Sequence, residues 1–229
     1  MTLFLLAFLA CDPAALARAS ASAEALDLHG ALAALRTAGN CDEAAGTIEY
    51  VEGLLGATEA FEKGGTIESL RDVRSAANAL SRRAEGGARK WEAASLALRA
   101  VIAGSQQERG EMGIYLAEAT RIEALLLAGG LAGAPLVTAH ELAGDLWLQV
   151  HQFADARAAY ERAATMLGYT PRILLGLGRA AEHLDDKAAA CAAYRSLAEW
   201  WDARSVERMP AEITRARERA ASLGCPSVR

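Results

Sequence analysis

Apolar residues recur along most of the chain at spacings of three and four positions, which place them on one face of an α-helix. Short breaks rich in Gly and Pro separate these stretches. No interval shows the sustained alternation of apolar and polar residues that is typical of a β-strand. The pattern therefore predicts an all-α chain with helices over ranges 21–38, 43–62, 66–85, 88–103, 108–128, 137–150, 153–167, 171–184, 187–201 and 208–223.

Composition agrees with this prediction and excludes one class of partner. Of the 229 residues, 52% are hydrophobic and 6% are aromatic. Alanine is abundant, and it favours helix because it loses no side-chain entropy there. The formal net charge is −5, and no run of five or six basic residues occurs. Nucleic acid is therefore not expected as a partner.

The first residues have the features of an export signal. Residues 3–10 form an uncharged apolar run that is too short to span a bilayer but matches a signal-peptide core. The segment Ala17–Ala19 fits the small-x-small pattern of leader cleavage. The segment Phe8–Cys11 resembles the lipobox of bacterial lipoproteins, and this resemblance implies a lipid on Cys11.

We therefore expect residues 1–19 to be a signal peptide or lipoprotein leader. The protein is then located in the cell envelope, either periplasmic or lipid-anchored to the membrane. The alternative is a cytoplasmic protein whose N-terminal helix is frayed.

The chain has four cysteines, Cys11, Cys41, Cys191 and Cys225. No CxxC motif or zinc-type cluster of Cys and His occurs, so no metal site is expected. Cys191–Cys225 is the first disulfide to test, because both residues lie in the C-terminal third of the chain. Reduced cysteines at helical packing positions are the alternative.

The C-terminal half contains an internal repeat. Like residues lie 34 positions apart in three pairs: Gly144 and Gly178, Ala156 and Ala190, Tyr160 and Tyr194. Residues 137–170 and 171–204 resemble two tetratricopeptide repeats, each of which is a pair of antiparallel helices. This resemblance implies an α-solenoid of stacked helical hairpins.

In such hairpins two helices cross closely where side chains are small, so Gly144 is expected to face Ala156, and Gly178 to face Ala190. The aromatic rings of Trp147 and Tyr160 are expected to fill the wider space towards the adjacent repeat.

The repeats define the expected organisation of the chain. Residues 20–134 are interpreted as degenerate hairpins of the same stacking type, with a plain helical bundle as the alternative. Residues 135–204 form the two repeats. Residues 205–229 form a polar capping helix and a tail. Of the pair Trp200–Trp201, one ring is expected under this cap and the other half-buried.

No residue pattern predicts catalysis. The segment Gly176–Ala181 reads GxGxxA, but a dinucleotide site needs this motif after a β-strand, and here it lies within a predicted helix. The sequence has no HExxH, GxSxG or GxxxxGK[ST] motif. We therefore predict no catalytic, cofactor-binding or metal-binding residue, and a protein that is not an enzyme.

The family resemblance implies a concave face lined by the first helix of each repeat, which binds a segment of a partner protein. The candidate partner-binding residues are Glu141, Asp145, Leu148, Arg172, Arg179 and His183. Because Glu141 and Asp145 repel a carboxylate, a basic or mixed-charge segment is expected. The predicted function is therefore a protein–protein interaction scaffold of the bacterial cell envelope.

Two alternatives remain open at the level of sequence. The first is a helical domain with ligand-binding or enzymatic activity in residues 21–128. Glu, Arg and Tyr side chains that converge in a deep pocket would favour it. The second is an architectural oligomer whose open repeat ends stack on one another.

Overall fold

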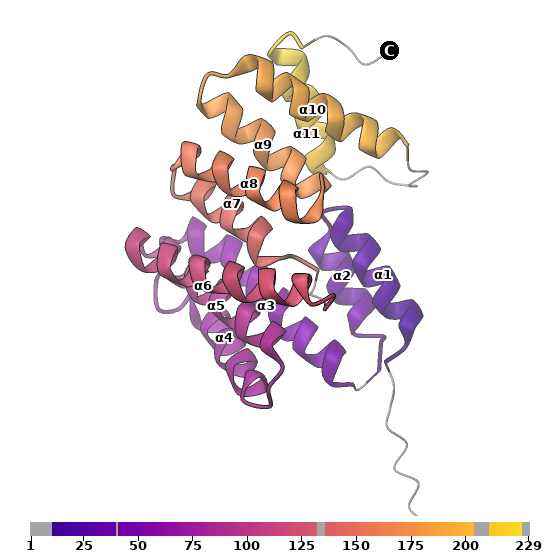
Figure 1. Cartoon of the computed structure of the whole chain (residues 1–229), viewed down its shortest axis with the longest axis vertical. Coiled ribbons are helices and arrows are strands. Elements are labelled where there is room, and N and C mark those ends of the chain that lie inside the picture. Colours follow the sequence, from indigo (N-terminus) through magenta and orange to yellow (C-terminus); the bar gives the residue numbers. More distant parts are fainter. Residues whose placement is uncertain (1–10, 40, 132–135, 204–210, 226–229) are drawn as a thin grey trace, which may run out of the picture.

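The computed structural model describes residues 11–39, 41–131, 136–203 and 211–225. All secondary-structure elements in these ranges are α-helices, so the all-α prediction is confirmed. The helices, shown in Figure 1, are α1 (Pro13–Glu24), α2 (Leu28–Leu35), α3 (Asp42–Glu62), α4 (Arg71–Ala84), α5 (Arg89–Ser105), α6 (Arg109–Ala128), α7 (Ala139–Gln149), α8 (Phe153–Leu167), α9 (Pro171–His183), α10 (Lys187–Asp202) and α11 (Ala211–Ser222).

The predicted helix over 21–38 is wrong, because the chain forms two helices there. α1 already begins at Pro13, with Asp12 as its N-cap, and it ends before a turn at Leu26 with a positive φ of 62°. Asp27 then caps α2 by accepting a hydrogen bond from the Gly30 N–H at 2.8 Å. Cleavage after Ala19, the leader boundary expected from sequence, would cut through α1.

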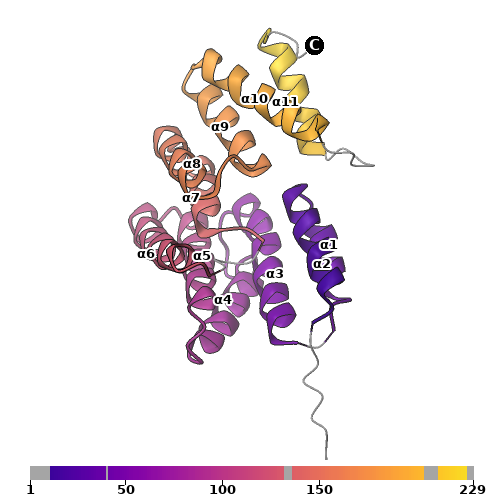
Figure 2. The same cartoon turned by 45° about the vertical axis from the view of Figure 1, so that its right-hand side comes forward.

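Successive helices pack as antiparallel hairpins: α1 with α2, α3 with α4, α5 with α6, α7 with α8, and α9 with α10. The first helices of neighbouring hairpins also touch, because α3 packs on α5, α5 on α7 and α7 on α9. This row of four helices therefore runs through the molecule from one end towards the other (Figure 2).

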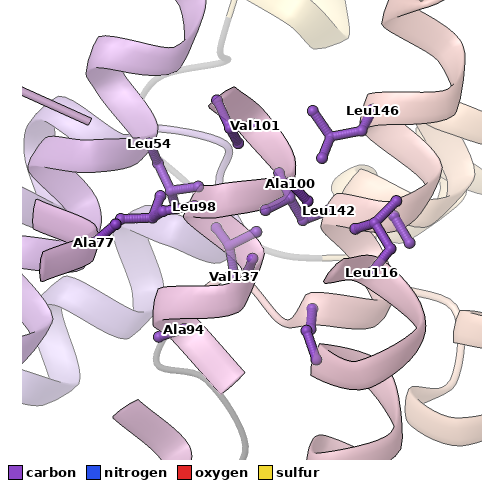
Figure 3. Packing of buried hydrophobic residues seen from close by; sticks show 14 of the residues in the cluster. Leu54, Ala77, Ala94, Leu98, Ala100, Val101, Leu116, Val137, Leu142 and Leu146 are labelled. Carbon is purple, nitrogen blue, oxygen red and sulfur yellow. The ribbon is translucent and has the colours of Figure 1, made fainter. Parts of the chain in front are cut away.

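The largest hydrophobic core connects both halves of the chain. It runs from α3 to α8 and includes Leu54, Leu98, Leu116 and Leu142, which come from four different helices (Figure 3). The buried Tyr50 hydroxyl also donates a 3.0 Å hydrogen bond to the Val137 carbonyl. Described residues from both sides of positions 132–135 thus belong to one core. None of the described helices has the length and apolar character needed to cross a bilayer.

The repeat glycines accommodate tyrosine rings. A Cβ on Gly144 would overlap the ring of Tyr160, and one on Gly178 would overlap the ring of Tyr194. Ala156 and Ala190, which were expected to face these glycines, are both fully buried. A tyrosine ring is larger than the methyl group of alanine, so it needs the space that a glycine leaves free.

Tyr160 also reaches the next hairpin, as expected. Its ring fills the space that a Cβ on Gly176 of α9 would occupy, so Tyr160 lies between glycines of α7 and α9. Trp147 contacts the preceding hairpin instead, where a Cβ on Gly113 would lie 3.7 Å from its ring. The GxGxxA motif is thus part of helix α9. Its first glycine, Gly176, leaves space for the aromatic ring of Tyr160.

The C-terminal helices form their own cluster. Trp201 is buried beneath Ile213 of α11, and Trp200 is partly buried beside it, so the expected arrangement of these rings is confirmed. Ala25 and Leu26, at the end of α1, pack against the same cluster. The first hairpin therefore approaches the last helices, as Figures 1 and 2 both show.

Candidate functional site

A groove with a volume of about 360 Å³ lies between the first hairpin and the C-terminal helices, and we call it the central groove. Its floor is formed by α7 and α9, with Leu146, Leu148 and Leu175 as apolar lining. α3 closes one side with Leu54 and Phe61, and α11 borders the other. The first helices of the two predicted repeats thus line a common groove.

An ion pair and a hydrogen bond fix the polar part of the floor. Asp145 accepts a hydrogen bond from the Tyr160 hydroxyl at 2.6 Å on one oxygen. Its other oxygen pairs with the Arg172 guanidinium at 2.7 Å. Burial, and then the charge of Asp145, raise the pKa of Tyr160 well above that of a free phenol, so this hydroxyl remains a donor. Both oxygens of Asp145 are therefore engaged within the protein.

Arg179 is the cation of the central groove that has no ion-pair partner among the described residues. The other charged groups of the lining are paired, Arg172 with Asp145 and Arg215 with Glu212 at 2.8 Å. The lining thus has three arginines against two carboxylates. Its unbalanced charge is positive and is located on α9.

Four of the six predicted partner-binding residues meet in this groove: Asp145, Leu148, Arg172 and Arg179. Glu141 does not, because only 6% of it is exposed. It forms a capping box with Thr138 at the start of α7 and accepts a 2.7 Å hydrogen bond from the Thr170 hydroxyl. Its predicted exposure is wrong, because its side chain satisfies the backbone at the helix start.

His183 lies outside the central-groove lining. Its ring stacks on Phe153 with centroids 4.1 Å apart and an interplanar angle of 4°. This contact joins α9 to the first residue of α8, so the ring helps to pack neighbouring hairpins.

Sequence reasoning missed the contribution of the N-terminal half to the groove. Leu54, Ala57 and Phe61 come from α3, and Val101 comes from α5. The 34-residue periodicity does not extend to this region, so no register indicated which face of these helices points inwards.

A second cluster, on α4, α5 and α6, combines Arg, Glu and Tyr as the alternative hypothesis requires. Arg74, Arg99, Glu111 and Tyr115 line a cavity of about 310 Å³. The Tyr115 hydroxyl donates to Glu111 at 2.9 Å at an exposed position. This hydrogen bond, followed by burial, raises the pKa of Tyr115, which disfavours a role as a base. The cluster is a surface feature and not a deep pocket.

All four cysteines are paired. Cys191 is bonded to Cys225, which was the first pairing to test, and Cys11 is bonded to Cys41. The predicted lipidation of Cys11 is wrong for this structure, because a sulfur in a disulfide cannot also carry a lipid. Each bridge joins a terminal hairpin to its neighbouring segment, so both ends of the helical array are fastened covalently.

The described residues contain no group of three or more His, Cys, Asp or Glu side chains able to hold a metal ion. No protein-family model, curated protein or solved structure matches the chain. The geometry of the central groove is therefore the basis for interpreting its function.

Proposed function

We propose that the protein is a non-enzymatic scaffold of a bacterial cell envelope that binds an extended segment of a partner protein in the central groove. The proposal includes a TPR-like α-solenoid, in which the first helices of successive hairpins form the concave face. Contacts of α3 with α5, α5 with α7, and α7 with α9 support this arrangement. The 34-residue repeat of α7 to α10 supports it from the sequence.

One observation carries the choice of ligand: the central groove combines apolar walls with Arg179, the one cation of its lining that has no ion-pair partner among the described residues. Leu148 and Leu175 offer surface for apolar side chains, which gain free energy on leaving water. Asp145 is already neutralised by Arg172. We therefore propose that the bound segment is apolar and carries a carboxylate, which revises the expectation of a basic segment.

Two disulfides support the location in the cell envelope. Disulfides persist in oxidising compartments such as the bacterial periplasm and are rare in the cytosol. The bridge to Cys41 requires Cys11, so we propose that the exported protein retains this residue. A leader consistent with the proposal ends before Cys11, and the mature protein is periplasmic.

Selection from a displayed library of random peptides tests this function. The oxidised protein is expected to enrich apolar peptides that contain Asp or Glu, and Arg179→Glu is expected to abolish their binding. Arg71→Glu is the matched control, because Arg71 is also exposed and has no ion pair among the described residues, but lies on α4 outside the groove. No enrichment, or enrichment that Arg179→Glu leaves unchanged, would refute the proposal.

Ligand binding by residues 21–128 is the second candidate. The cluster of Arg74, Arg99 and Tyr115 favours it, since two guanidinium groups face one cavity. A small dianion such as sulfate is the appropriate probe. Saturable binding of sulfate that Arg99→Gln removes would support this candidate over a purely structural role of the cluster.

A further inference from the structure

A second cavity, with a volume of about 440 Å³, opens between α6, α7 and α8, and we call it the outer cavity. It is separate from the central groove, because the two sites use different faces of α7. His140, Ala143 and Trp147 line the outer cavity, at spacings of three and four residues. Leu142 and Leu146 line the central groove.

The polar centre of the outer cavity is a buried histidine with a fixed orientation. His140 Nδ1 lies 2.7 Å from Glu123 Oε2, and the backbone N–H of His140 donates to the same oxygen at 3.0 Å. Glu123 is fully buried, and His140 is 9% exposed. Because an ionised carboxylate only accepts hydrogen bonds, Nδ1 carries a proton. In the neutral ring, Nε2 then has a free lone pair.

The second ring nitrogen of His140, Nε2, is free to accept a hydrogen bond. Among the described residues, Nε2 has no hydrogen-bond partner. Every fully buried side-chain nitrogen or oxygen atom in these residues does have one, so Nε2 is not fully buried. Nε2 therefore has accessible surface, and His140 is one of the residues that line the outer cavity. A pairing of one ring nitrogen with a carboxylate leaves the other nitrogen poised to accept a hydrogen bond.

The remaining lining is mostly apolar. Leu116, Ala143, Trp147 and Met166 form its walls, and Arg162 lies at its exposed side. The indole of Trp147 offers an aromatic surface for a flat ring. A cavity of this volume and character is suited to a small molecule that is apolar except for one polar group.

We propose that the outer cavity binds a small phenol, whose hydroxyl donates a hydrogen bond to His140 Nε2 and whose ring packs on Trp147. The lone pair on Nε2 matches the hydroxyl donor of a phenol, and Arg162 favours the partial negative charge on the phenol oxygen. A metal ion is a poorer match, because the described residues offer no group of ligands around this nitrogen. The proposal does not depend on the function of the central groove.

Calorimetric titration of the oxidised full chain with 4-propylphenol and propylbenzene tests the proposal. The informative variant is His140→Asn, because the Asn side-chain amide replaces Nδ1 and preserves the hydrogen bond to Glu123 while Nε2 is lost. The affinity for 4-propylphenol should fall about fivefold, the value of one neutral hydrogen bond. The affinity for propylbenzene should not change.

His151→Asn is the matched control, because His151 is exposed, lies outside the cavity and has a positive φ that Asn tolerates. Nitrogen-15 NMR gives a readout that needs no variant: the Nε2 resonance of His140 should shift with 4-propylphenol and stay in place with propylbenzene. Absence of phenol binding would overturn the proposal. Equal effects of the two compounds on Nε2 would also overturn it.

Discussion

Gly176→Ala tests whether neighbouring hairpins share one interior. Gly176 lies within α9, and a Cβ there would overlap the ring of Tyr160, which belongs to α8 of the preceding hairpin. The ring has no room to retreat, because a Cβ on its other neighbour, Gly144 of α7, would overlap it as well. One added methyl group therefore acts on the contact between hairpins.

The expected magnitude follows from two opposing effects. Replacing Gly by Ala within a helix stabilises it by about 1 kcal/mol. Inserting a methyl group into a closely packed core costs about 1–3 kcal/mol. Because Tyr160 is completely buried and held from both sides, we expect the upper end of this cost. Gly176→Ala should lower the free energy of unfolding by about 2 kcal/mol.

Gly113→Ala is the matched control, because Gly113 also lies inside a helix but its added Cβ would be in ordinary contact, 3.7 Å from Trp147. This change should stabilise the protein by about 0.5–1 kcal/mol. Urea unfolding followed by circular dichroism measures both variants. In the background of Tyr160→Leu, the penalty of Gly176→Ala should disappear. The reasoning is refuted if Gly176→Ala stabilises the protein as much as Gly113→Ala does.

Three further predictions concern the disulfides, high pH and the polar floor of the groove. Replacing Cys191 and Cys225 by Ser should reduce the free energy of unfolding by about 4 kcal/mol, because the bridge closes a loop with a sequence separation of 34. The oxidised wild type should show no free thiol among the described residues in a thiol titration. Burial raises the pKa of Tyr50 and that of Tyr160 above the usual value of 10. Their contribution to stability should therefore be constant below pH 10 and fall above it, as the unfolded chain loses these protons. Phenolate absorbance that develops for both residues before the loss of helix would contradict this. Asp145→Asn should destabilise the protein by about 1.5–3 kcal/mol in urea unfolding, because it weakens a hydrogen bond and an ion pair at partly buried positions; a change within 0.5 kcal/mol would show that the pair contributes little.

Most helices were predictable because their signals are local. α8 occupies 153–167 as predicted, and α9 begins at Pro171, after Thr170 caps it through the Ile173 N–H. The break between α1 and α2 was missed because it contains neither Gly nor Pro and depends on Leu26 in a left-handed conformation. Such a turn is unusual for Leu, so the sequence gives no warning of it.

The candidate site was predictable only in part. The places of Asp145 and Arg179 follow from the repeat register. The burial of Glu141 was also predictable, since Thr138 and Glu141 have the spacing of a capping box. Contacts between distant segments left no local signal. The pair of His140 and Glu123 spans two helices, and the apolar wall from α3 depends on how the hairpins curve.

The central claim, that a partner segment binds in the central groove, is tested most directly by methyl NMR of the oxidised protein with a selected acidic peptide. We predict chemical-shift changes at Leu54, Leu148 and Leu175, which line the groove from both sides. Ile67 and Ile114, which are 80% and 70% exposed outside its lining, should remain unchanged. Shifts at these two isoleucines, with the three leucines unaffected, would contradict the account.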